Sequence, residues 1–386
     1  MSFGTIIYIG GFELPDKDAA AHRVLNNAKV LRELGYDVVF IDVNRGTKAK
    51  KILDYKNIQG FNVWTRKFPD SIAGWLEYLI SISAVKKVIN KYNNVKAVIC
   101  YNYQSVSLYN LIKYCKKKNI KIIADCTEWY EDNRLIKKLD TEFRMQFLHK
   151  RVDGIICISK YLESYYSKYV NTVVIPPLVD SEETKWKFKV QKVNDGKIHF
   201  VYSGSPGKHK DKLNYIIKAF NNIIKELTNF KFTIIGLTKE QYLRLYPEHI
   251  NIINNMDECI NFKGRISHEQ SLKHVKAADF QIFIRENKRV NNAGFPTKFV
   301  ESMACGTPVI TTKTSDLDNY LLIGENGYFI DSEDNREFEN TLQTIIKMKP
   351  NQISEMKKYC GNYTVFSYKN FVRPLESFLE NVIKKR

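Results

Sequence analysis

Long apolar runs are missing from this chain of 386 residues. None approaches the roughly 20 consecutive apolar residues that a membrane-spanning helix requires. The first residues, 1–10, lack both a basic leader and an apolar stretch long enough for a signal peptide. We therefore expect a cytoplasmic protein whose first residues form a buried strand.

Paired cysteines are missing as well. The seven cysteines are dispersed along the chain, without a Cys-x-x-Cys pair and without a histidine clustered beside them. This pattern favours free thiols in a reducing compartment over a disulfide framework or a zinc site. No metal ligands and no bound cofactor are predicted.

Acidic residues are fewer than basic ones, with 42 Asp and Glu against 60 Lys and Arg, which gives a formal charge of +18. The excess is spread over both halves of the chain. It fits ordinary solvated basic faces, and it equally fits attraction to a polyanion, either an anionic membrane surface or a nucleic acid.

Short β-branched runs alternate with helical patterns, which predicts an α/β fold of parallel sheets covered by helices on both faces. We expect strands at 5–9, 38–41, 97–100, 121–124, 154–158, 173–175, 198–203, 231–235, 280–284 and 308–311. Helical patterns in the first half lie near 19–34, 75–90 and 107–117.

The length predicts two domains of ordinary size. The first spans residues 1–180 and ends just after Pro176 and Pro177, and the charged stretch 181–197 is expected to be the linker. The second domain spans 198–365, and an amphipathic helix is predicted over 366–386.

The most informative segment is a Gly294-Phe295-Pro296-Thr297 turn that opens a helix carrying Glu301. The first turn of a helix presents free N–H groups and the positive end of the dipole, which suits a phosphate. A carboxylate deeper in the helix can accept hydrogen bonds from sugar hydroxyls. The segment is therefore interpreted as a nucleotide-binding site.

This segment resembles the donor-binding segment of the family 4 (GT4, group 1) glycosyltransferases, which usually shows a glutamate, seven residues and a second glutamate. Here Glu301 takes the second position and Ala293 the first. The resemblance runs over nearly the whole chain. It implies the GT-B architecture: two Rossmann-like parallel-sheet domains facing a cleft, with the C-terminal helix crossing back to the first domain. The first domain would bind the acceptor and the second the nucleotide-sugar donor.

Several loops match the family's donor-binding loops. The glycine loop after the first strand contains Gly10 and Gly11, although two glycines after a strand more often form only a turn. In the opposite domain the loop 203–212 contains Gly204, then Ser205 where the family has an arginine, and Lys210 at the family's lysine. A solvated basic loop is the alternative there.

Two cations could replace the missing arginine. Arg285 follows the strand 280–284, and Lys298 lies in the first turn of the helix, where it opposes the dipole unless an anion is bound. Lys298 could also simply point into solvent. Gly264, Arg265 and Ile266 match the family loop that receives the base.

In the first domain, Asp125, Thr127 and Glu128 follow a predicted strand. Many family members have a histidine at the position of Thr127, beside the transferred sugar. Asp125 and Glu128 could contact sugar or acceptor hydroxyls, or cap the next helix instead.

The resemblance implies retaining hexosyl transfer from a nucleotide diphosphate sugar. Negative charge builds on the leaving diphosphate, so cations lower the barrier. We expect metal-independent transfer, with Lys210, Arg285 and Lys298 stabilising the leaving group, and we name no nucleophile or base. UDP is the expected nucleotide and GDP the second choice.

The acceptor is expected to be a glycan or a lipid-linked molecule. The pattern over 71–90, with lysines at 86, 87 and 91, could lie on an anionic bilayer at the inner face of the cell membrane, although a helix packed on a sheet is commoner. A lipid-linked acceptor would suit bacterial surface polysaccharide assembly.

Two alternative functions remain: a nucleotide-sugar isomerase or epimerase on the same fold, and a basic nucleic-acid-binding protein. No nucleic acid partner is expected under the preferred interpretation.

Overall fold

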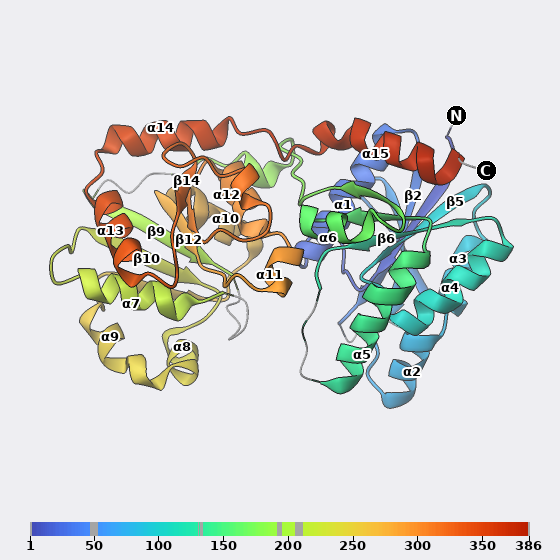
Figure 1. Ribbon diagram of the computed structural model, residues 1–386, viewed down its shortest axis with the longest axis horizontal. Helices are drawn as coiled ribbons and strands as arrows, with labels where there is room; N and C mark the ends of the chain where they lie inside the picture. Colours follow the sequence, from blue (N-terminus) through green and yellow to red (C-terminus); the bar gives the residue numbers. More distant parts are fainter. Residues whose placement is uncertain are drawn as a thin grey trace. The chain divides into compact units, whose positions relative to one another are not determined.

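The computed structural model describes residues 2–46, 53–129, 131, 134–190, 195–204 and 211–384, apart from the side chain of residue 384. They form two compact units (Figure 1). Unit 1 contains the described residues of Met1–Leu178, Ala293–Phe295 and Phe366–Arg386. Unit 2 contains those of Val179–Asn292 and Pro296–Val365.

The described part of unit 1 has a sheet of eight strands in the order β3-β4-β2-β1-β5-β6-β7-β8. All neighbouring strands are parallel except β3 and β4, which are antiparallel. The strands are β1 (Thr5–Gly10), β2 (Asp37–Asn44), β3 (Leu53–Ile58), β4 (Phe61–Lys67), β5 (Val95–Tyr101), β6 (Lys121–Cys126), β7 (Gly154–Cys157) and β8 (Asn171–Val174).

The described part of unit 1 also contains helices. They are α1 (Ala19–Glu33), α2 (Ile72–Ile80), α3 (Ser83–Ile89), α4 (Ser105–Lys117), α5 (Leu135–Phe143), α6 (Lys160–Tyr166) and α15 (Val372–Leu379). α5 continues into the π-helical turn η1 (Arg144–Leu148), and η6 (Tyr368–Phe371) and η7 (Glu380–Lys384) flank α15. Leu375 and Phe378 of α15 join the core cluster that α1 forms with β1 and β2. The C-terminal residues are therefore part of the core of unit 1.

The sheet of unit 2 has, among its described residues, six parallel strands in the order β11-β10-β9-β12-β13-β14. The strands are β9 (Ile198–Ser203), β10 (Phe230–Ile235), β11 (Ile260–Gly264), β12 (Phe280–Phe283), β13 (Val309–Thr311) and β14 (Gly327–Phe329). The central pair, β9 and β12, therefore ends at the same edge of the sheet.

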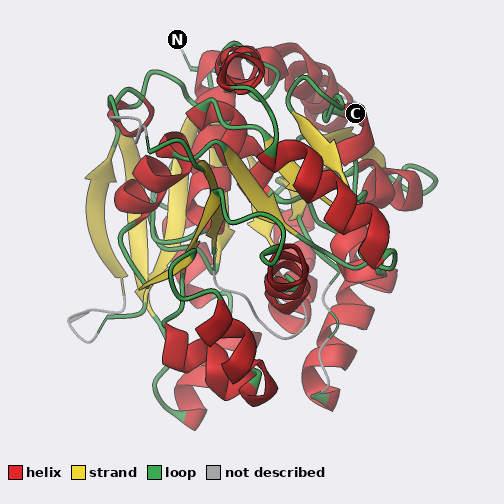
Figure 2. Cartoon of the chain, turned by 90° about the vertical axis from the view of Figure 1, so that its left-hand side faces the viewer, coloured by secondary structure: helices red, strands yellow, loops and turns green. Residues whose placement is uncertain are grey.

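Helices flank the strands of unit 2 (Figures 1 and 2). They are α7 (Leu213–Ile223), α8 (Lys239–Leu245), α9 (Ile250–Asn255), α10 (His268–Ala277), α11 (Arg289–Ala293), α12 (Thr297–Cys305), α13 (Asn335–Ile346) and α14 (Pro350–Gly361). Because strand side chains alternate between faces, the sheet has two cores. Phe200 packs against Phe220 of α7, and Val201 clusters with Leu272 of α10 and Cys305 of α12.

The α/β class with two parallel-sheet domains is confirmed, and the strands expected from the sequence agree with observed strands to within a few residues. The helix expected over 75–90 is instead two helices, α2 and α3, with a break at Ser81. The β3–β4 hairpin and β14 were not predicted. The stretch 181–197, expected as a linker, groups with unit 2 as far as it is described, because Trp186 and Phe188 pack on its core.

Membrane-spanning helices are absent from the described residues, none of whose helices combines the required length and apolar character. The seven cysteines are all buried and carry free thiols.

Candidate functional site

A buried carboxylate, Asp211, organises the carboxyl edge of the sheet of unit 2. It accepts hydrogen bonds from the hydroxyl of Tyr202 at 2.7 Å and from Nε of Arg285 at 3.0 Å. The ammonium of Lys298 forms a third, very short ion pair with the same carboxylate. Side chains from β9, from the residue two positions beyond β12 and from the first turn of α12 thus converge on one acid.

The backbone of Arg285 is held in place by two hydrogen bonds to the side chain of Thr312. Its N–H donates to the hydroxyl oxygen of Thr312 at 3.0 Å, and that hydroxyl donates to the Arg285 carbonyl at 2.6 Å. Thr312 directly follows β13, the neighbour of β12 in the sheet. Two adjacent strand ends therefore hold Arg285 in place while its side chain reaches Asp211.

Gly204 gives Lys298 the space to reach this cluster. Its φ of +153° lies in a region that residues with a Cβ seldom adopt, and a Cβ there would stand 2.5 Å from Cε and Nζ of Lys298. Any larger residue would displace the lysine. Gly204, which we predicted to lie close to the donor, is therefore also needed for a structural reason, namely to leave space for Lys298.

The Asp211 cluster, defined as Tyr202, Asp211, Arg285 and Lys298, carries surplus positive charge. Burial alone would raise the pKa of Asp211, but the charges of Lys298 and Arg285 outweigh it and hold that pKa well below its usual range. Burial, reinforced by the Asp211 charge, raises the pKa of Tyr202, which stays a neutral donor. One anion thus faces two cations, so the cluster favours a further anion.

A second pair of polar side chains lies on α10 and α12. Nε2 of His268 lies 3.2 Å from Oε1 of Glu301, and both side chains are about a quarter exposed, at 28% and 25%. His268 is the first residue of α10, whose N-cap, Ser267, forms a capping box with Gln270. Glu301 therefore has a neighbour that orients it and still keeps part of its surface in solvent.

The predicted base-binding loop begins where β11 ends. Gly264 adopts a φ of +64°, and its carbonyl accepts a hydrogen bond from the N–H of Gly236 at 2.8 Å. Arg265 is exposed, whereas Ile266 packs partly on the apolar cluster around Leu272. The loop thus combines a buried glycine, whose backbone is hydrogen-bonded to neighbouring residues, with the exposed Arg265 and an apolar side chain held against the core of unit 2.

Two family models match most of the chain. Residues 183–364 match the family described as glycosyl transferases group 1, and residues 20–183 match glycosyltransferase family 4. The chain belongs to the group 1 glycosyltransferases.

Relatives and solved structures extend the comparison. An uncharacterized glycosyltransferase of Methanocaldococcus jannaschii is 24% identical over 363 residues, which cover 92% of this chain and 88% of that protein. The catalytic domain of starch synthase IV from Arabidopsis thaliana, bound to ADP and acarbose, is 10% identical with a TM-score of 0.72 and full coverage of both chains, 100% and 100%. HepE of Anabaena, in complex with UDP and glucose, is 13% identical with a TM-score of 0.68 and covers 98% of this chain and 99% of its own. Such distant structural matches establish the GT-B fold of this glycosyltransferase.

The turn that opens α12 is divided between the two units of the glycosyltransferase. Pro296 is the N-cap of α12 and Thr297 its first residue, both in unit 2. Gly294 and Phe295 group with unit 1, where the Phe295 ring lies 5.9 Å from that of Phe366. The four residues predicted as one phosphate-binding turn of the second domain are therefore not all part of that unit.

In unit 1, Asp125 requires a correction. It is fully buried, and its carboxylate accepts hydrogen bonds from Nη2 of Arg23 at 2.7 Å and from the hydroxyl of Tyr8. Arg23 also donates to the carbonyl of Ile175 at 2.8 Å. Asp125 neither faces solvent nor caps a helix, because its oxygens are satisfied by buried donors of the protein.

The other residues singled out in unit 1 have distinct surroundings. Thr127 is buried and accepts a hydrogen bond from Nδ2 of Asn102 at 2.7 Å, whereas Glu128 is half-buried. Gly10 ends β1, and a Cβ on it would come within 2.8 Å of Cβ of Tyr101, so close packing against β5 requires this glycine. Gly11 is in more open surroundings: among the described residues, only the Tyr78 hydroxyl, at 3.6 Å, comes within 4 Å of a Cβ built on it.

Ser205 and Lys210 lie outside the described residues. Sequence reasoning missed Asp211, Tyr202 and His268. One signal for Asp211 was available: an acid directly after the lysine-rich run 208–210 is a natural counter-ion for cations brought to the same sheet edge. The pairing of His268 with Glu301 spans 33 residues and had no local signal.

Carboxylate triplets of the Asp-x-Asp type do occur in the sequence, at 16–18 and 316–318, although we expected no metal ligands. Asp18 caps α1 and pairs with Arg45 at 3.2 Å, and Asp318 pairs with Lys313 at 3.5 Å. Within the described ranges, no group of three His, Cys, Asp or Glu side chains has the arrangement of a metal site. Metal-independent transfer stays a prediction.

Proposed function

We propose that this glycosyltransferase transfers a sugar, with retention of anomeric configuration and without a metal, from a nucleotide diphosphate sugar bound by unit 2. The observation that carries the proposal is the surplus positive charge of the Asp211 cluster. Lys298 lies in the first turn of α12, where the positive end of the helix dipole repels a cation. An anionic ligand bound there would offset this unfavourable interaction. A diphosphate supplies that anion.

The donor is proposed to be a UDP-sugar, with a GDP-sugar as the second choice. The resemblance to GT-B enzymes supports a nucleotide, and HepE of Anabaena was solved with UDP and glucose. We assign the ribose hydroxyls to Glu301 and the base to the turn at Gly264–Ile266. Starch synthase IV was solved with ADP, so the choice of base requires its own test.

The chemistry we propose follows from charge development at the anomeric carbon. The bond from that carbon to the diphosphate oxygen breaks, and the electron pair leaves with the nucleoside diphosphate. An acceptor hydroxyl attacks from the same face and forms the new bond, and its proton passes to the departing diphosphate. Lys298 and Arg285 stabilise the negative charge that builds on the leaving group.

The acceptor is proposed to be a glycan or a lipid-linked molecule bound by unit 1, in the assembly of a surface polysaccharide at the cytoplasmic face of the membrane. The family resemblance and the basic charge of the chain support this choice.

Thermal unfolding with UDP, GDP, ADP and CMP tests the donor assignment. A ligand that binds only the native state raises the melting temperature. We expect UDP to give the largest shift, with GDP second. Equal shifts with all four nucleotides, or none, would overturn the donor assignment.

Incubation with UDP-sugars tests the reaction. Slow release of UDP is the expected result. An altered sugar without UDP release would instead indicate an isomerase or epimerase.

A further inference from the structure

Helix α2 is apolar and yet exposed. Its sequence, Ile-Ala-Gly-Trp-Leu-Glu-Tyr-Leu-Ile, contains one charged residue, and Tyr78 is its only buried residue. Ile72 is 84% exposed, and Trp75, Leu76 and Ile80 are also exposed. A helix that is apolar on all sides is normally enclosed by protein or lipid. The described residues of unit 1 give α2 no such enclosure.

Helix α5 and its continuation η1 show the same anomaly. Leu135, Leu139, Phe143 and Phe147 recur every four residues and are all exposed, and Ile136 beside them is 79% exposed. The inward face of the same helices supplies Met145 and Leu148 to the core, along with Thr141 and Arg144. Hence this segment has one apolar face for the fold and a second apolar face that the described part of unit 1 does not cover.

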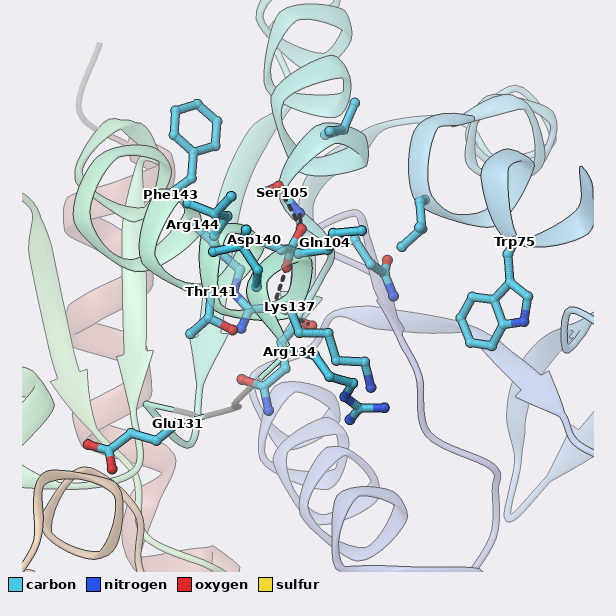
Figure 3. A pocket seen from close by; sticks show the side chains of 16 residues that line it. Trp75, Gln104, Ser105, Glu131, Arg134, Lys137, Asp140, Thr141, Phe143 and Arg144 are labelled. Atoms are coloured by element: carbon cyan, nitrogen blue, oxygen red, sulfur yellow. Dashed lines mark hydrogen bonds and ion pairs between the residues drawn. The ribbon is translucent and has the colours of Figure 1, made fainter. Parts of the chain in front are cut away.

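The exposed sides of α2 and α5 enclose a groove of about 1440 Å³, with the first turn of α4 between them. Its walls include Trp75, Leu79, Val106, Leu135, Leu139 and Phe143. In Figure 3, Trp75 and Phe143 lie on opposite sides of this pocket. The volume exceeds the roughly 300–1,000 Å³ of typical small-molecule pockets. The groove therefore suits an extended apolar occupant better than a compact ligand.

Positive charge accompanies the apolar surface. Arg134, Lys137 and Lys138 lie in or next to the first turn of α5, and all three are exposed. Figure 3 shows Arg134 and Lys137 projecting into the space between Phe143 and Trp75. Of the acids nearby, Asp140 turns inward and accepts a hydrogen bond from the hydroxyl of Ser105 at 2.6 Å, and Glu142 accepts one from Nε1 of Trp129 at 3.1 Å. Glu131, which also lines the groove, and Glu77 on α2 are exposed.

We propose that the exposed faces of α2 and α5, here called the docking surface, bind unit 1 to an anionic lipid bilayer. The aliphatic side chains enter the boundary of the acyl region, and Arg134, Lys137 and Lys138 contact headgroup phosphates. The pairing of exposed lysines with exposed aliphatic side chains favours lipid as the occupant, because surfaces that lie on anionic bilayers combine these two kinds of residue, whereas lysine is depleted at interfaces between proteins. The docking surface consists of residues of unit 1, whereas the proposed donor site consists of residues of unit 2.

Sedimentation of the full-length protein with vesicles tests the proposal. We expect binding to vesicles that contain phosphatidylglycerol and weaker binding to phosphatidylcholine alone. The double variants Ile72→Ser/Leu76→Ser and Leu135→Ser/Leu139→Ser should each reduce binding at least about tenfold, because inserted apolar area is lost. Lys137→Gln/Lys138→Gln should weaken binding to the anionic vesicles alone.

A matched control is Leu322→Ser/Ile323→Ser, which removes two exposed aliphatic side chains from unit 2 and should leave vesicle binding unchanged. Serine variants that bind vesicles as well as the wild type would overturn the proposal. The proposal would also be overturned if the wild-type protein did not bind vesicles and sedimentation velocity showed that it dimerises through this face. An unchanged melting shift with UDP in the serine variants separates loss of docking from loss of the donor site.

Discussion

Each unit buries an aspartate beside a tyrosine and an arginine at the carboxyl edge of its sheet, but the two clusters differ in charge. In the described part of unit 1, Arg23 is the one cation that pairs with Asp125, and Tyr8 and Asn27 complete the hydrogen bonds of this carboxylate. In unit 2, Asp211 has two cationic partners, Arg285 and Lys298. The first cluster is neutral and sealed, whereas the second is cationic and lies beside Gly204 and the first turn of α12.

The difference shows how one structural device can serve two purposes. A balanced buried pair fixes the chain: Arg23 joins α1 to the residues that follow β8 by donating to the carbonyls of Ile175 and Pro176. An unbalanced pair leaves a site with attraction for an anion. Burial by itself does not distinguish the two aspartates, but the number of cations around each does.

The largest expected effect compares Asp125→Asn with Asp211→Asn. Asp125→Asn removes the carboxylate that pairs with Arg23, and Asp211→Asn removes the one that pairs with both Arg285 and Lys298, so each variant should lower the free energy of unfolding by about 3–5 kcal/mol. UDP should raise the melting temperature of Asp211→Asn more than that of Asp125→Asn, because its diphosphate can replace the missing carboxylate. Equal UDP shifts in the two variants would contradict the difference that we draw between the clusters.

Next in size is the loss of leaving-group stabilisation in Lys298→Gln. We expect kcat for UDP release to fall about 100–1,000-fold, the range typical of removing one donor that stabilises developing charge. Lys313→Gln, which changes a lysine with a 66% exposed side chain in the same unit, serves as the control and should be unaffected. A Lys298→Gln rate close to wild type would remove this lysine from the reaction.

Glu301→Ala should have a smaller effect. Loss of a charge-assisted hydrogen bond costs about 1.5–3 kcal/mol, or roughly 10–100-fold in UDP affinity, and should reduce the melting shift at a fixed UDP concentration accordingly. Glu355→Ala, at an exposed position of α14, is the matched control. If UDP raised the melting temperature of Glu301→Ala as much as that of the wild type, the ribose assignment would be excluded. The proposed role of the Asp211 cluster would not be affected.

The smallest effect concerns acid pH. Because the folded-state pKa of Asp211 is lowered, the stability it contributes is fully present above the usual aspartate pKa of about 3.9 and is lost as pH falls through the lowered value. The difference in unfolding free energy between wild type and Asp211→Asn should therefore be constant near neutral pH and shrink below about pH 4. A difference that changes between about pH 5 and 8 would point to another titrating group.

Much of the fold could be predicted from local sequence. β9, at 198–203, and the start of α1 at Ala19 coincide with the expected bounds, because β-branched runs and helical periodicity are local signals. The break between α2 and α3 was missed, since an apolar run offers no periodicity to mark it. The candidate site was predicted in part: Arg285 and Lys298 were chosen as cations, but the acid that brings them together was not.

The sequence by itself determined which chemical groups this glycosyltransferase has near its sheet edges: glycines where strands end, cations after them and Glu301 one turn into α12. Only the tertiary structure decided which of those groups meet. Asp125 and Asp211 have similar local contexts, but the pairing of β9 with β12 gives Asp211 a second cation, and burial against α1 restricts Asp125 to one. The physical reason is that a carboxylate's role depends on the charges within a few ångströms of it, and those charges come from residues as many as 102 positions away in the chain.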